Sequence, residues 1–112
     1  DGIWVSNHGG RQVDGGRTSL DALVEVMAEV QERLPVFFDS GVRSGADVFK
    51  ALALGATAVG LGRPFALALG LAGEEGVLEV LESTLAELDL TMAFAGCCSI
   101  EDIRATSLLR KQ

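Results

Sequence analysis

The sequence contains one histidine, no tyrosine and only two cysteines among its 112 residues. The two cysteines, Cys97 and Cys98, are adjacent, which is a poor geometry for a structural disulfide and is not a spacing typical of metal ligands. We therefore expect a reduced thiol pair in a cytoplasmic protein, and we predict no metal site. The single histidine leaves only one imidazole available as a general base.

Long hydrophobic runs and an excess of positive charge are also missing. No apolar run reaches the length needed to span a bilayer, and no basic segment followed by an apolar one indicates export. Nine Lys and Arg residues stand against 16 Asp and Glu, giving a net charge of −7. This balance argues against a nucleic-acid surface, which needs clustered positive side chains. The composition, 48% apolar and 22% charged, is that of a soluble globular domain.

The most informative stretch is the polar loop from Ser6 to Gln12, which follows an apolar run and contains both His8 and Arg11. An imidazole titrates near neutral pH and can act as a general base. A guanidinium offers a planar fork of donors that fits a carboxylate. The loop could therefore bind a small carboxylic acid and remove a proton from it. A lone histidine in a glycine-rich loop is also compatible with a solvated side chain of no catalytic importance.

Two further loops repeat this arrangement. The apolar run 35–38 leads into residues 39–45, which include Asp39 and Arg43, and the run 57–61 leads into Gly62, Arg63 and Pro64. Each glycine- and arginine-containing loop thus follows a predicted buried strand and precedes a predicted helix. An acidic protein that gathers its arginines at one end of a sheet is suited to binding small anions.

The predicted elements alternate between strands and helices. Hydrophobic patterning predicts strands at 2–6, 35–38 and 57–61, the first of them fully buried. Helical spacing predicts helices at 19–33, 45–54, 64–71, 77–89 and 91–96, with a break at 73–76 and a short helix after Ser99. Thr18, Ser44 and Ser99 are each followed three residues later by an aspartate, as in a capping box.

This alternation predicts parallel βαβ units with both faces of the sheet covered. In such sheets the ligand lies beyond the carboxyl ends of the strands. All three glycine and arginine loops fall at that edge. The chain begins at Asp1 and enters an apolar run at once, so we expect it to be a piece of a longer protein.

Four linked motifs closely resemble the C-terminal part of the FMN-dependent 2-hydroxy-acid oxidases and dehydrogenases. They are the loop 6–12, the stretch 39–43, the stretch 47–56 and the tripeptide 62–64, in the same order and spacing. The resemblance implies an α/β fold in which residues 1–112 are a partial domain, the sixth to eighth units plus closing helices of a (β/α)₈ barrel. Three units cannot close a barrel, so we expect unpaired strand edges and open helix faces, which favour self-association.

The resemblance also implies roles for the site residues. His8 matches the family's base, which takes the substrate's hydroxyl proton while a hydride equivalent passes to flavin N5, and Arg11 matches the clamp on the substrate carboxylate. The resemblance places FMN, through its phosphate and ribityl chain, against a further set of residues: Asp39, Ser40, Gly41, Arg43, Gly62 and Arg63. The helix beginning near Ser44 is expected to point its positive end at the same phosphate. Asp39 could instead be a turn cap.

The substrate expected from the resemblance is a small (S)-2-hydroxy acid. Ser40 stands where many family members have glycine and lactate-oxidising members have serine, which favours L-lactate. The family's substrate-selecting tyrosines would lie outside this chain. Related enzymes are homo-oligomers, so we expect the full-length protein to be one. Two alternatives remain: another FMN- or phosphate-binding barrel enzyme, which would not need the His8 and Arg11 pair, and an inactive truncated half-barrel.

Overall fold

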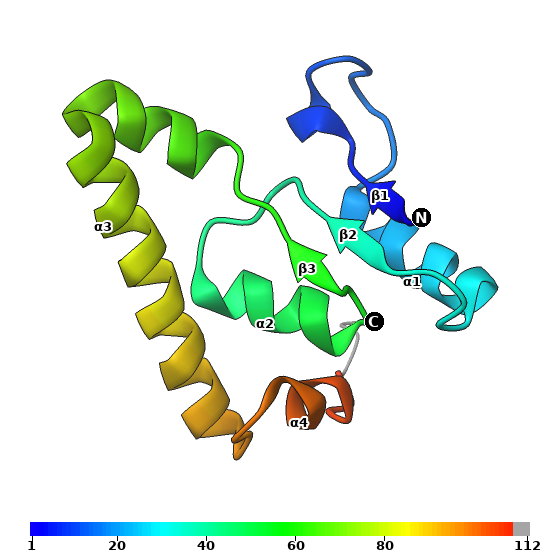
Figure 1. The fold of residues 1–112 in the computed structure, drawn as a ribbon. Coiled ribbons are helices and arrows are strands. Elements are labelled where there is room, and N and C mark those ends of the chain that lie inside the picture. Colours follow the sequence, from blue (N-terminus) through cyan, green and yellow to red (C-terminus); the bar gives the residue numbers. More distant parts are fainter. Residues whose placement is uncertain (109–112) are drawn as a thin grey trace.

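A computed structural model describes residues 1–108 as three short parallel strands with helices packed against one face. Figure 1 shows the path of the chain. The elements in chain order are β1 (Ile3–Val5), the 3₁₀ turn η1 (His8–Gly10), α1 (Ser19–Val30), β2 (Val36–Phe38), α2 (Gly45–Ala53), β3 (Ala58–Val59), α3 (Arg63–Ala95) and α4 (Ile100–Arg104). The predicted α/β class and the parallel strand direction are confirmed.

The sheet has the order β1-β2-β3, so sequence neighbours are also spatial neighbours. Trp4 is opposite Phe37 in the register, and Phe37 is opposite Ala58. Because β2 is central, β1 and β3 each leave one edge unpaired within the described residues. The open edges expected of a partial barrel are therefore present.

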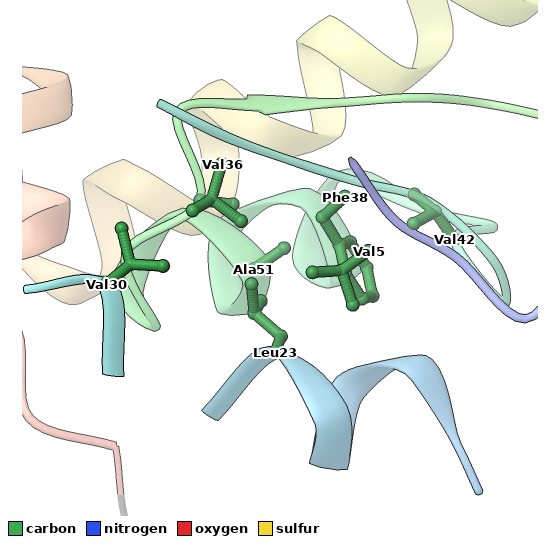
Figure 2. Packing of buried hydrophobic residues seen from close by; sticks show 8 residues of the cluster. Val5, Leu23, Val30, Val36, Phe38, Val42 and Ala51 are labelled. Carbon is green, nitrogen blue, oxygen red and sulfur yellow. The ribbon is translucent and has the colours of Figure 1, made fainter. Parts of the chain in front are cut away.

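The main core lies between the sheet and the helices α1 and α2 (Figure 2). Val5, Val36 and Phe38 point from the strands toward Leu23 of α1 and Ala51 of α2. A second cluster, which includes Phe49, Leu88, Cys97 and Ile103, joins α2 to α3 and α4. Leu23 and Ala51 lie in the predicted helices 19–33 and 45–54, and their apolar side chains face the core, as expected of amphipathic helices.

The opposite face of the sheet is open in the described chain, contrary to the prediction that both faces are covered. Trp4 is 63% exposed, and Ala58 is also exposed. Their neighbours on the same strands point the other way, toward the helices, because side chains alternate along a strand. The first strand is therefore buried on one face only, and the prediction of a fully buried strand was wrong for this chain.

The helix starts agree with the capping prediction. The side chains of Thr18, Ser44 and Ser99 accept hydrogen bonds from the main-chain N–H groups of Asp21, Asp47 and Asp102 respectively. A side-chain oxygen in this position satisfies one of the free N–H groups in the first helical turn. Each of these helices begins directly after its predicted cap.

The helix ends differ from the predictions in two places. Helix α1 ends at Val30, where residues 19–33 were predicted, because Gln31 and Glu32 adopt the left-handed conformation. The predicted break at 73–76 is a kink at Ala72 and Gly73 inside α3, and the predicted helices 77–89 and 91–96 are one continuous segment. Gly76 lies within the helix, close to Ala68, where the two segments of α3 approach each other.

Candidate active site

A cavity of about 300 Å³ opens at the edge where the three strands end. Its lining comes from the loops after β1, β2 and β3, so three segments that are distant in sequence meet there. The cavity brings together every site residue expected from the sequence: His8, Arg11, Asp39, Ser40, Gly41, Arg43, Gly62 and Arg63. Their gathering in one cavity is what parallel strand topology predicts.

Asp39, the residue directly after β2, joins two of these loops through its carboxylate. Its Oδ1 accepts hydrogen bonds from the hydroxyl groups of Ser6, at 2.5 Å, and Ser40, at 2.7 Å. Its Oδ2 accepts one from the indole Nε1 of Trp4 at 2.8 Å. An ionised carboxylate has about four acceptor positions, so three donors leave room for a further hydroxyl.

These contacts determine the charge state of Asp39. Burial raises the pKa of this carboxyl, but the hydrogen bonds from Ser6, Ser40 and Trp4 and the nearby charge of His8 outweigh burial and hold the pKa below its ordinary value. Asp39 is therefore ionised at neutral pH and places a negative charge in the cavity, directly after the C-terminal end of β2.

The loop that contains His8 folds into the tight turn η1. His8, Gly9 and Gly10 all have positive φ angles, of 54°, 65° and 76°. Two main-chain hydrogen bonds close the turn, from Gly10 N to Asn7 O and from Arg11 N to His8 O. The His8 and Arg11 side chains are both exposed at the cavity, where a small ligand could reach them.

Three arginines concentrate positive charge in the cavity. Arg11, Arg43 and Arg63 form no ion pair with any residue in the described range 1–108. The Arg63 guanidinium lies close to the loop after β1, since a side-chain carbon added at Gly9 would be 3.6 Å from its Nη2 atom. These guanidinium groups are therefore available to an anionic ligand.

The donor set fits a phosphate group, although not at the helix expected from the sequence. At the start of α2, the N–H groups of Arg43 and Gly45 donate to the carboxylates of Asp47, at 3.1 Å, and Glu87, at 2.8 Å. The start of α3 has neither a side-chain cap nor an acidic residue in its first turn, and the space beside Gly62 is open. The uncapped N-terminus of α3, with Arg63, is thus the better match for an anion.

Sequence reasoning missed two residues that contact the site. Ser6 was placed in the loop 6–12 but given no role. Its hydroxyl donates a hydrogen bond to Asp39 Oδ1 and accepts one from the main-chain N–H of His8 at 3.1 Å. Trp4 was assigned to a buried strand, yet its indole reaches Asp39. No pattern in the sequence pairs positions 4 and 39, because this contact depends on the register between β1 and β2.

Comparison with known proteins decides the family. The family described as FMN-dependent dehydrogenase matches residues 1–110. The chain belongs to this family. As a member of it, the chain is related to enzymes that use FMN, which agrees with the unpaired arginines that line the cavity. The match also counts against the alternative of a different phosphate-binding barrel.

The individual relatives are 2-hydroxy-acid oxidases. The chain is 51% identical over 108 residues to an L-lactate oxidase of Lentilactobacillus hilgardii, covering 96% of this chain and 29% of that protein. It is 52% identical over 103 residues to a peroxisomal (S)-2-hydroxyacid oxidase of Arabidopsis thaliana, covering 92% of this chain and 28% of that protein. The chain therefore spans less than a third of the length of these curated relatives.

Solved structures give the same result. A refolded Pediococcus acidilactici protein described as a lactate oxidase superimposes with a TM-score of 0.95 at 50% identity, covering 99% of this chain and 31% of that one. A mandelate oxidase solved with benzoyl-formic acid gives a TM-score of 0.88 at 48% identity, covering 92% of this chain and 31% of that one. The described fold is thus a part of a larger oxidase fold.

The cellular location and the oligomeric state of the protein were also predicted from the sequence. No helix within residues 1–108 is both long and apolar enough to cross a lipid bilayer. Because one relative is named as peroxisomal, the cytoplasmic location stays a prediction, as does the homo-oligomer.

Proposed function

We propose that the full-length protein containing this chain oxidises a small (S)-2-hydroxy acid, with L-lactate as substrate, to the 2-oxo acid. The observation that supports this most is that a candidate base, His8, and a candidate carboxylate clamp, Arg11, share one cavity with the phosphate-binding arginines 43 and 63. Family membership and the names of the relatives support the same chemistry.

Each residue has a distinct task in this proposal. Arg11 binds the substrate carboxylate with paired hydrogen bonds and thereby fixes the orientation of the α-carbon. His8 accepts the proton of the α-hydroxyl group, a step worth on the order of 10²–10⁴ in rate. Bound FMN supplies the acceptor for the hydride equivalent that leaves the α-carbon. The α-hydroxyl proton and the hydride equivalent together account for the two-electron oxidation.

The FMN site in this proposal is formed by the loops after β2 and β3. Arg43, Arg63 and the main-chain N–H groups near Gly41 and Gly62 bind the phosphate, because the glycines let the main chain approach closely and the two guanidinium groups form no ion pair within residues 1–108. Asp39 accepts a ribityl hydroxyl at its remaining acceptor position. Within the whole protein, we place this chain as the sixth to eighth units and closing helices of a (β/α)₈ barrel, whose other units cover the exposed side of the sheet.

The preference for L-lactate over larger or smaller 2-hydroxy acids is proposed from Ser40, which follows the pattern that the resemblance gives for lactate-oxidising members of the family. The relatives include L-lactate oxidases, glycolate oxidases and mandelate oxidases, so they support the substrate class. The test compares kcat/KM for L-lactate, glycolate and (S)-mandelate in the full-length protein. The proposal predicts the highest value for L-lactate, and a preference for either other acid would contradict the assignment of substrate.

The carboxylate clamp is tested with Arg11→Met in the same protein. Loss of a charge-assisted hydrogen-bond pair should raise KM for L-lactate by about 10-fold or more, without loss of FMN. Arg17→Met is the matched control, since Arg17 lies near the same loop but pairs with Glu25 and does not line the cavity. Unchanged kinetics in Arg11→Met would rule out the clamp.

A further inference from the structure

The loop with the candidate base is held in an unfavourable backbone conformation. His8 has a φ angle of 54°, in the left-handed region that non-glycine residues adopt only when their surroundings enforce it. Gly9 and Gly10 continue the left-handed turn without a side-chain penalty. Something in the structure must therefore fix the position of His8.

Two serine hydroxyl groups accept the main-chain N–H groups of this turn. Ser6 Oγ accepts from His8 N at 3.1 Å. Ser40 Oγ accepts from Asn7 N and from Gly9 N, each at 3.3 Å. Three consecutive N–H groups, from residue 7 to residue 9, thus bind side chains on either side of the turn.

Asp39 orients both hydroxyl groups. A serine hydroxyl has one proton, and both Ser6 and Ser40 donate theirs to the same oxygen, Asp39 Oδ1. With the proton directed at the carboxylate, the lone pairs of each hydroxyl face the turn. Trp4 Nε1 binds the other oxygen of Asp39 and so fixes the rotation of the carboxylate. Ser40 has a φ angle of 83°, a left-handed conformation that is unfavourable for serine. Its hydrogen bonds with Asp39, Asn7 and Gly9 hold the residue in this conformation.

We propose that Asp39, Ser6 and Ser40 form a positioning network for His8, with Trp4 as its outer support. The network acts through the backbone of the turn and does not touch the reacting atoms, so its members are positioning residues in this role. It links the end of β2, where the ribityl chain would bind, to the base after β1. This inference rests on the proposed function and adds residues that set the geometry of the base.

The first test uses Ser6→Ala and Ser6→Thr in the full-length protein containing this chain. Ser6→Ala removes the acceptor for His8 N and one donor to Asp39, so kcat for L-lactate should fall by about 10-fold to 100-fold. KM for L-lactate and FMN content should stay within about twofold, because the clamp and the phosphate ligands keep their own side chains. Ser6→Thr retains the hydroxyl and should recover most of kcat.

The second test removes only the outer support. Trp4→Phe keeps an aromatic ring against Phe37, whose ring centroid is 5.7 Å from that of Trp4, but removes the donor to Asp39 Oδ2. We expect a fall in kcat of about 10-fold, as for loss of one hydrogen bond to a charged group, with FMN retained. This variant decides the question if Ser6→Ala does not fold or does not bind FMN.

Measurements on the wild-type protein distinguish failure of the proposed oxidase function from failure of the proposed positioning network. If it does not oxidise any 2-hydroxy acid, the proposed function fails. If it does, and FMN-loaded Ser6→Ala or Trp4→Phe keeps the wild-type kcat, the positioning network is wrong. Equal impairment of Ser6→Ala and Ser6→Thr would likewise overturn it, because the hydroxyl would then not be the group that matters.

Discussion

At the scale of single residues, the candidate site depends on which polar groups are already satisfied within the protein. The carboxylate of Asp39 has three donors, whereas the guanidinium groups of Arg11, Arg43 and Arg63 have no acidic partner in the described part of the chain. Unpaired arginines at the end of a sheet are therefore the groups that can bind a ligand's negative charge. Asp39 serves to organise the loops around them.

Arg63 should be a principal contact of the FMN phosphate. In the full-length protein, Arg63→Ala removes a guanidinium at the uncapped start of α3 and should weaken FMN binding by about 10-fold to 100-fold. The measurement is the fraction of flavin retained through gel filtration, followed by titration of the apoprotein with FMN. Arg33→Ala is the control, because Arg33 lies beyond the C-terminal end of α1, donates through its Nε to Val30 O and does not line the cavity. Full retention of FMN in Arg63→Ala would exclude this role.

The residues of the site could be predicted from the sequence, and their interactions could not. Glycine, arginine and histidine residues at the ends of apolar runs predicted that His8, Arg11 and the loops after β2 and β3 would lie together, because parallel topology places all such loops at one edge. The bonds from Ser6 and Trp4 to Asp39 depend on strand register, which single positions do not reveal.

At the scale of elements, short-range signals predicted where helices begin, and long-range packing determined where they end or bend. Thr18, Ser44 and Ser99 act locally, so the sequence indicated all three starts. Gly76 was interpreted as part of a break, but its missing side chain lets one segment of α3 approach Ala68 of the other. A glycine required for close packing cannot be distinguished from one that ends a helix without knowledge of the neighbouring segment.

The start of α2 should respond to acid through Asp47. Burial raises the pKa of this carboxyl, but hydrogen bonds from Arg43 N and Ser44 Oγ and the charge of Lys50 outweigh burial and hold the pKa below its ordinary value of 3.8. A lowered pKa in the folded state means that the ionised carboxylate stabilises the fold above pH 3.8, and that this stability is lost as pH falls through the lower folded-state value.

The variant Asp47→Asn tests this assignment. At pH 7 it should be less stable than the wild type by about 0.5–1 kcal/mol, the worth of a negative charge at a helix N-terminus. The difference should shrink as the pH falls below about 4, where the wild type also begins to lose the charge. Thermal unfolding of the full-length proteins at several pH values measures it. A difference that does not depend on pH would show that the charge of Asp47 is not the stabilising feature.

At the scale of the whole molecule, the described chain resembles one sector of a larger structure. Helices cover one face of the sheet, while Trp4 on the other face is 63% exposed. Along α3, Leu71 is 88% exposed and Phe94 is 91% exposed. Apolar side chains exposed on this scale indicate surfaces that are covered by a partner or by further parts of the same protein. Hydrophobic patterning alone could not show this, because the burial expected of an apolar residue assumes that its packing partners are present. The open helix faces were expected only from the resemblance to a part of a barrel.

The 112-residue chain by itself should lack oxidase activity and should self-associate. Its cavity is formed by three strand ends only, and its open sheet edges and apolar helix faces can pair with other copies. Sedimentation velocity should detect species larger than the 11.7 kDa monomer, and peroxide assays with L-lactate and FMN should give no signal above background. A monomeric chain that oxidises L-lactate would contradict this view of the molecule.

The most direct test of the whole account is the reduction of bound flavin by L-lactate under anaerobic conditions in the full-length protein, with His8→Gln measured beside the wild type. We expect L-lactate to bleach the visible flavin absorbance of the wild type. His8→Gln should remain yellow with bound FMN but bleach about 10²-fold to 10⁴-fold more slowly, because no group replaces the base. Bleaching of His8→Gln at the wild-type rate, or a wild-type protein that L-lactate does not reduce, would contradict the account.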